Sequence, residues 1–291
     1  MKLAVASCTK LQDTNPQPVW RDIQTEKPDA LLLLGDNVYL DHNNHDEPVA
    51  LTAELQALYQ AQFAEPNFAA LLADMRSRDC PIIAIYDDHD FLGNNRYGGD
   101  YGPALRRAAR NAFIQAFSPP LTGNDVFHIH HLGLVDLVVL DERFYRQSPA
   151  VSASDRDAIL GHEQWVWLEQ IVQTSAAPYL VIASSTTLHT FGDESWEQYP
   201  TAFRRLVALL SGRKGALVAS GDVHRNAVYD DSGVIEIVTS AVARKGLVFG
   251  TQRQNYGLLT FDSAKVRIDL RSRKVGWRFD FDIPLNRWTL P

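Results

Sequence analysis

Short apolar runs alternate with amphipathic stretches through most of the chain, and this pattern predicts β-strands separated by α-helices. The expected strands cover residues 2–7, 30–34, 81–86, 125–131, 134–140, 178–184 and 215–220. The expected helices lie near 20–23, over 50–75, from Pro103 onward, and at 161–174 and 200–211. The sequence shows no internal repeat and no low-complexity linker. We therefore expect a single α/β domain over residues 1–291.

The pattern changes from residue 226 onward. Apolar and polar residues alternate there, as in 266–271, and this period is typical of antiparallel strands with one solvated face. We expect two packed, mixed sheets with helices outside and with the last strands completing the second sheet.

Three of the expected strands end in acidic residues. Asp87-Asp88-His89-Asp90 follows the strand at 81–86, Gly35-Asp36 follows 30–34, and Gly221-Asp222-Val223-His224 follows 215–220. In layered α/β folds, ligands bind at the carboxyl ends of strands. Carboxylates and imidazoles bind multivalent cations, and packed carboxylates without a partner are costly. The pattern favours one metal cluster over three unrelated acidic loops.

The first strand ends at Cys8, and thiolates are strong ligands for transition metals. Cys8 taken alone is more often a small buried apolar residue, and its place at a strand end favours the metal ligand. Cys80 is the only other cysteine, so no disulfide framework is predicted, and low cysteine usage fits a reducing compartment. His42 and His45, in the polar loop after Tyr39, either border the site or belong to a solvated loop.

Composition narrows the function classes. The net charge of −7 argues against a general nucleic-acid binder, although a metal-dependent nuclease remains open. No apolar run approaches the roughly 20 residues that cross a bilayer, and no secretory signal is evident, so we expect a cytoplasmic protein with no membrane partner. The glycine-rich loop of phosphotransfer kinases is missing from the sequence. The sequence leaves the oligomeric state open.

Five ordered motifs resemble those of the alkaline phosphatase D (PhoD-like) family of metallophosphoesterases over nearly the whole chain. They are Trp20 through Tyr39 with Lys27-Pro28-Asp29 and Leu34-Gly35-Asp36-Asn37, then Asp87-Asp88-His89-Asp90, Leu140-Asp141-Glu142-Arg143-Phe144-Tyr145-Arg146, the stretch 160–168, and Ser220-Gly221-Asp222-Val223-His224. Glu142 and Thr187 depart from the family pattern. The resemblance implies a calcineurin-like double β-sheet sandwich flanked by helices.

The resemblance also implies a metal site. Cys8, Asp36 and Tyr39 would hold an iron(III), with Asp222 as a further ligand. Asp36 would bridge to a second metal, which Asp88 would also bind. This second metal would be calcium or another divalent ion such as manganese, zinc or magnesium. From the residues alone, Tyr39 would be an ordinary half-buried tyrosine.

The implied activity is hydrolysis of a small-molecule phosphate ester, of the alkaline phosphatase or phosphodiesterase type, by a metal-bound hydroxide at Asp36. His89 would protonate the leaving oxygen, and His224 would ligate a metal or hydrogen-bond the phosphate. Arg143 would clamp the phosphate, unless it forms a structural pair with Asp141 or another acid. Asn37 and Asn95 would add substrate contacts. The alternatives are a nuclease or phospholipid-type phosphodiesterase using the same metals, and a non-catalytic metal-binding or carbohydrate-binding sandwich.

Overall fold

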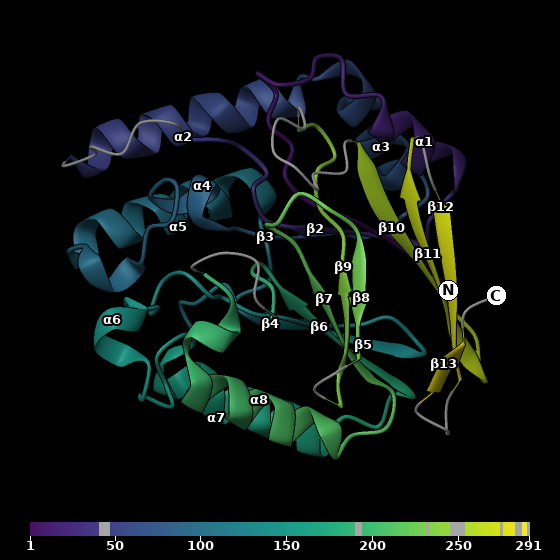
Figure 1. Cartoon of the computed structure of the whole chain (residues 1–291). Helices are drawn as coiled ribbons and strands as arrows, with labels where there is room; N and C mark the ends of the chain where they lie inside the picture. Colours follow the sequence, from purple (N-terminus) through teal and green to yellow (C-terminus); the bar gives the residue numbers. More distant parts are fainter. Residues whose placement is uncertain are drawn as a thin grey trace.

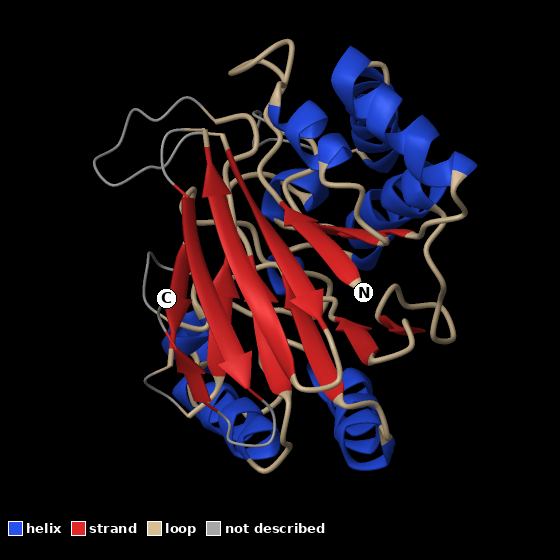
Figure 2. Ribbon diagram, turned by 90° about the vertical axis from the view of Figure 1, so that its right-hand side faces the viewer, coloured by secondary structure: helices blue, strands red, loops and turns tan. Residues whose placement is uncertain are grey.

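The computed structural model describes residues 1–40, 47–189, 194–230, 233–244 and 254–273, together with the backbone of 276–282 and 287–289. His42 and His45 lie outside the described residues. Two β-sheets pack face to face in the middle of the molecule, and helices cover the two outer faces (Figures 1 and 2). The expected pair of mixed sheets with helices outside is confirmed.

The first sheet has seven strands in the order β13-β12-β11-β10-β1-β2-β3. Its strands are β1 (Lys2–Ala6), β2 (Ala30–Leu34), β3 (Ile82–Ile85), β10 (Asn255–Phe261), β11 (Lys265–Ser272), β12 (Gly276–Asp282) and β13 (Arg287–Thr289). β1, β2 and β3 are parallel, with Leu3 beside Ala30 and Leu31 beside Ile82. The carboxyl ends of these three strands therefore lie at one edge of the sheet.

The second sheet has six strands in the order β4-β5-β6-β7-β9-β8. Its strands are β4 (His128–His131), β5 (Val135–Val139), β6 (Tyr179–Ser184), β7 (Ala216–Ser220), β8 (Ala227–Tyr229) and β9 (Ile235–Val238). β5, β6, β7 and β9 run parallel, while β4 forms the expected antiparallel hairpin with β5. The edge strand β8 is antiparallel to β9.

Two expectations about the end of the chain are wrong. β9 pairs in parallel with β7, although antiparallel pairing was expected from residue 226 onward. The last strands, from β10 to β13, extend the first sheet and not the second, because β10 pairs antiparallel with β1. The predicted alternation is present in β11, where Val266, Ile268 and Leu270 are fully buried.

The helices divide between the two outer faces. They are α1 (Val19–Thr25), α2 (Pro48–Phe63), α3 (Pro66–Ser77), α4 (Asp88–Phe91), α5 (Pro103–Phe117), α6 (Pro149–Ser152), α7 (Gly161–Thr174) and α8 (Pro200–Ser211), with short 3-10 turns at Gly98–Asp100 and Trp196–Gln198. The long helical stretch expected at 50–75 is divided into α2 and α3 at Glu65, whose carboxylate caps α3 by accepting from the Phe68 N–H.

Three apolar clusters account for this layering. One lies between the sheets and includes Val5, Leu32, Val181 and Leu217. A second joins the first sheet to α1, α2, α3 and α5, and a third joins the second sheet to α7 and α8. Burying strands on both faces explains why their sequences are almost continuously apolar. None of the described helices has the length and the apolar character needed to cross a membrane.

Candidate metal centre

Two glycines allow the strand ends of the two sheets to approach closely. Gly35, after β2, has φ +89°, and a Cβ there would lie 2.5 Å from the Asp87 Cβ. Gly221, after β7, lies against the first sheet, where a Cβ would lie 2.9 Å from both the Leu34 carbonyl oxygen and the Ser7 hydroxyl. Only glycine fits such approaches. The acidic ends of β2, β3 and β7 are thereby brought to one point.

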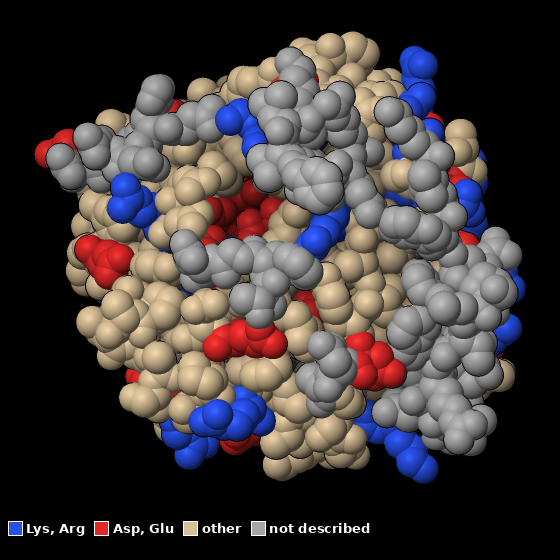
Figure 3. Space-filling view, viewed as in Figure 1, with Lys and Arg blue, Asp and Glu red and all other residues tan. Residues whose placement is uncertain are grey.

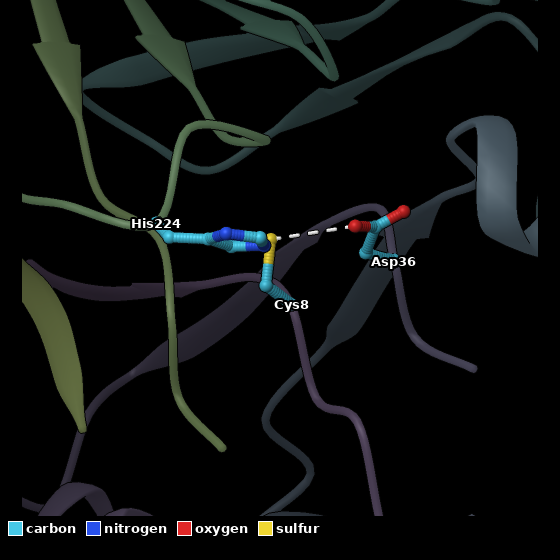
Figure 4. Close-up of side chains that lie close together, drawn as sticks. All are labelled: Cys8, Asp36 and His224. Atoms are coloured by element: carbon cyan, nitrogen blue, oxygen red, sulfur yellow. Dashed lines mark hydrogen bonds between the residues drawn. The ribbon is translucent and has the colours of Figure 1, made fainter. Parts of the chain in front are cut away.

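Asp36 is the centre of this cluster. Its Oδ2 accepts a 2.7 Å hydrogen bond from the Tyr39 hydroxyl and lies 3.5 Å from the Cys8 Sγ. Its Oδ1 is buried and has no hydrogen-bond partner among the described residues. Figure 4 shows the Cys8 thiol between Asp36 and the imidazole of His224, with the three side chains coming from separate strand ends. The unpaired, buried Oδ1 of Asp36 is therefore available to ligate a metal ion.

Two overlapping groups of potential metal ligands share Asp36. Cys8, Asp36 and His224 form one, and Asp36, Asp88 and His89 form the other; within each, the ligand atoms lie within 4.8 Å of one another. His89 Nδ1 and His224 Nε2 are buried and lack hydrogen-bond partners in the described parts of the chain. The Asp36 carboxylate, which belongs to both groups, would be placed to bridge two neighbouring metal ions.

The electrostatics of the cluster also favour a cation. Burial and the nearby Cys8 raise the pKa of Asp36 well above its usual value. Burial raises the pKa of the Cys8 thiol to about 11, despite hydrogen bonds with Ser240 and Ser7 that oppose the shift. Anionic forms of these groups are thus unfavourable in the protein alone, and a bound metal would stabilise them. The donor set of thiol, phenol, carboxylate and imidazole fits a metal of this kind.

Backbone strain is concentrated in the same place. Five predicted site residues have left-handed backbone conformations that non-glycine residues rarely adopt: Cys8 (φ 58°), Asp36 (φ 53°), Asn95 (φ 56°), Asp222 (φ 67°) and His224 (φ 55°). Such residues each cost about 1–3 kcal/mol and cluster at functional sites. Their coincidence with the expected ligands supports a functional role for this region.

The Asp87-Asp88-His89-Asp90 segment divides into different roles. Asp90 is a structural acceptor: its carboxylate receives the N–H groups of Asn37, Val38 and Asp87 at 3.0–3.1 Å, and thereby ties the loop after β2 to that after β3. Asp88 accepts from the Asn95 N–H at 2.6 Å. Burial opposes ionisation of Asp88, but Arg143 and His89 outweigh it, and the pKa of Asp88 lies below its usual value. Asp88 is therefore an anion available to a cation.

Arg143 lies beneath the site and is fully buried. Its Nε donates to Asp87 at 2.6 Å, and its two terminal nitrogens donate to Glu194 at 2.7 and 3.1 Å. One terminal nitrogen is also 3.9 Å from Asp88. The guanidinium is committed to these carboxylates, so the contacts favour the structural pair, with Asp87 and Glu194 as the acids, over the phosphate clamp.

The other predicted residues lie around the cluster. Asp222 places its carbonyl oxygen 3.7 Å from the Cys8 Sγ, while its carboxylate belongs to neither ligand group. Asn37 is buried and donates from Nδ2 to the Ile85 carbonyl; its Oδ1 has no partner among the described residues. Asn95 contacts Asp88 through its backbone. Burial, with Arg244 next, lowers the pKa of His224 to about 4, which keeps the imidazole neutral and able to ligate.

Two polar residues after β9 were missed by the sequence reasoning. The Ser240 hydroxyl is 2.9 Å from the Cys8 Sγ and accepts from the His224 N–H at 3.0 Å. Arg244 lies near the Tyr39 ring, with 5.0 Å between its Cζ and the ring centroid. The signal was available, because Thr239-Ser240 follows an apolar run just as Asp36 and Asp222 do.

Glu142, a departure from the family pattern, has an internal role. Its carboxylate accepts from the Ser184 hydroxyl at 2.6 Å and from the Thr186 N–H and hydroxyl at 3.1 and 2.8 Å. Thr187, the second departure, donates its hydroxyl to the His189 carbonyl. Both residues fix the loop after β6.

Figure 3 shows a hollow on one face of the molecule, with Asp or Glu side chains in its floor and Lys or Arg side chains at its rim. An acidic floor with a basic rim suits an anion that binds through metal ions.

Comparisons with known proteins agree with this fold. The sequence model of a family described as PhoD-like phosphatase matches residues 3–278. A solved structure described as the structure of PhoD has a TM-score of 0.79 and 19% identity, and the match covers 100% of this chain and 71% of that one. GAP50, described as the anchor in the inner membrane complex of Plasmodium, has a TM-score of 0.59 and 14% identity, covering 97% and 89%. A comparison with curated proteins found no match.

Proposed function

The chain belongs to the PhoD-like phosphatase family and is a metal-dependent phosphoric ester hydrolase, and on this premise we propose which of its residues perform the hydrolysis. The observation that carries the proposal is the shared position of Asp36 in two adjacent groups of potential ligands. GAP50 has a similar fold and is described by an anchoring role, so the fold alone does not establish catalysis.

We assign Cys8, Asp36, Tyr39 and His224 to one cation, with Asp222 adjacent, and Asp36 and Asp88 to a second, with His89 beside them. Thiol and phenol donors next to a carboxylate favour iron(III) at the first position. Calcium prefers oxygen ligands, so it suits the second position only if His89 does not ligate; manganese or zinc would tolerate the imidazole. Loss of iron in Cys8→Ser, measured by elemental analysis, supports the thiolate assignment, and retention of iron contradicts it.

When bound, metal ions lower the pKa of a coordinated water and neutralise phosphoryl oxygens. The protein residues position the reaction. The 2.7 Å hydrogen bond between the Tyr39 hydroxyl and Asp36 places the phenol oxygen beside the shared carboxylate, where it would join the ligands of the first cation. His89 packs on the Tyr39 ring, 4.2 Å between centroids, which holds its imidazole at the cluster. We assign to His89 the protonation of the leaving oxygen, with metal ligation as the alternative that its place beside Asp36 and Asp88 favours.

The substrate is a small-molecule phosphate ester, in keeping with the family. The net charge of −7 disfavours nucleic acid as the main substrate, because polyanions are bound through basic surfaces. The cytoplasmic location and the single domain stay predictions.

The test uses purified enzyme with a chromogenic phosphate monoester and diester. Asp88→Ala and His89→Ala should each reduce turnover at least about 100-fold, the scale of a lost catalytic group. The controls are Glu163→Ala and His162→Ala, two exposed side chains on α7, and both should retain full turnover. Full activity in Asp88→Ala would contradict the proposal. Metal content of His89→Ala separates the two roles of His89: an unchanged content indicates the acid, and a lost metal indicates the ligand.

A further inference from the structure

Two basic side chains converge on the ring of Tyr39, at the edge of the candidate metal centre. The Arg244 Cζ lies 5.0 Å from the ring centroid, and the Lys10 Nζ lies 5.2 Å from the same point. The Tyr39 hydroxyl donates a hydrogen bond to Asp36, so the charged ends of Arg244 and Lys10 lie near the carboxylate that the two ligand groups share. They reach this point from different segments, since Lys10 follows β1 and Arg244 follows β9.

Arg244 has the hydrogen-bonding capacity that Arg143 lacks. About 23% of its side chain is exposed, whereas that of Arg143 is fully buried and paired with Asp87 and Glu194. One terminal nitrogen of Arg244 forms a loose ion pair with Asp13 at 3.4 Å. Its Nε has no hydrogen-bond partner among the described residues. A guanidinium presents five N–H donors in a planar fork that matches phosphate oxygens.

The charge of Arg244 acts on the site itself. Its guanidinium carbon lies 5.0 Å from the centre of the Tyr39 ring, and the Tyr39 hydroxyl is hydrogen-bonded to Asp36. A fixed positive charge at this place favours an anion that extends from the metal cluster toward Arg244.

Resting on the proposed function, we propose that Arg244, assisted by Lys10, binds the second negative charge of a phosphate monoester dianion and gives the enzyme a preference for monoesters over diesters. A phosphate monoester has a second pKa near 6 and is mostly a dianion above pH 7. A diester carries a single negative charge and has a second organic group in place of the charged oxygen. Only the monoester offers a charged oxygen to the guanidinium fork while its other oxygens face the metal cluster.

The experiment compares kcat/KM for p-nitrophenyl phosphate and bis(p-nitrophenyl) phosphate at pH 8. The wild type should prefer the monoester. Arg244→Ala should lose about 10- to 100-fold on the monoester, which is the usual effect of a hydrogen bond between charged groups, and much less on the diester. Inorganic phosphate, tested as a competitive inhibitor, should bind more weakly by a similar factor. Arg244→Lys should keep part of the preference, because it retains the charge and loses the fork.

Arg204→Ala serves as the matched control, because Arg204 is exposed on α8, on the outer face of the second sheet. It should leave both rates, phosphate inhibition and the unfolding midpoint unchanged. Metal content should be the same in wild type and Arg244→Ala, which excludes an indirect effect through the cluster. Equal losses on the two esters, or a wild-type preference for the diester, would overturn the inference. If the wild type hydrolysed neither ester, the proposed function itself would fail.

Discussion

Replacing Gly35 by alanine tests whether the close approach of β2 and β3 builds the site. Gly35 has φ +89°, which alanine rarely adopts. Its Cβ would lie 2.5 Å from the Asp87 Cβ and 2.9 Å from the Asp87 nitrogen. Neither neighbour can move freely, because the Asp87 N–H is bound to Asp90 and the Asp87 carboxylate to Arg143.

Two costs follow from this geometry. A left-handed conformation costs a residue with a side chain about 1–2 kcal/mol. Forcing an extra methyl into a packed position costs about 1–3 kcal/mol. The sum of about 2–5 kcal/mol is a large share of a typical unfolding free energy of about 5–15 kcal/mol. Because the strain falls between Asp36 and Asp87, we also expect Gly35→Ala to bind metal more weakly.

The assay is urea unfolding of wild type, Gly35→Ala and Gly212→Ala under identical conditions. Gly212 is a matched control, since it has φ −76° and no atom lies within 4 Å of an added Cβ. We expect Gly212→Ala to change the unfolding free energy by no more than about 1 kcal/mol. If Gly35→Ala were no less stable than Gly212→Ala, the steric account of the β2–β3 approach would be refuted.

Two further predictions concern the buried Arg143 and the half-buried His130. Arg143→Leu should lower the unfolding free energy by about 3–5 kcal/mol, because it leaves Asp87 and Glu194 buried without their cation. The control Arg156→Leu should change the unfolding free energy little, since 64% of the Arg156 side chain is exposed. Equal unfolding midpoints for the two variants would contradict the structural role of Arg143. Burial, reinforced by His128, lowers the pKa of His130 to about 4, below its unfolded value of about 6.5. The unfolded chain therefore binds the proton first, and stability should be lost as pH falls from about 6.5 toward 4. His130→Gln should weaken this dependence in pH-resolved unfolding curves and the exposed His162→Gln should not; identical curves for wild type and His130→Gln would refute it.

Much of the fold and part of the site could be predicted from the sequence, because both depend on where apolar runs end. The parallel strands β2, β3 and β7 have nearly the predicted bounds, since they are buried on both faces and their apolar character is continuous. Their acidic ends come together where the two packed sheets meet, because β2 and β3 belong to the first sheet and β7 to the second. The resemblance to a family added Cys8 and Tyr39, which the residues alone left ambiguous.

The rest depends on contacts between segments far apart in the sequence. Nothing in the motif around Arg143 indicates that Glu194 would occupy its guanidinium. Nor does the sequence place Arg244 beside Tyr39, about 200 residues away. The partner of the last strands is a further case. Alternation in β11 predicts a strand, and only the antiparallel pairing of β10 with β1 decides which sheet the last strands join.

The central claim is that the strand-end cluster around Asp36 holds the metal ions that hydrolysis requires. The most direct test measures metal content and ester hydrolysis together, on the same preparation of the whole protein, before chelation, after chelation and after metal is restored. We predict that turnover falls in proportion to the metal removed and returns on restoration, and that Asp36→Ala neither retains the metal nor recovers activity. Undiminished hydrolysis by metal-free protein, or normal metal content in Asp36→Ala, would contradict the account.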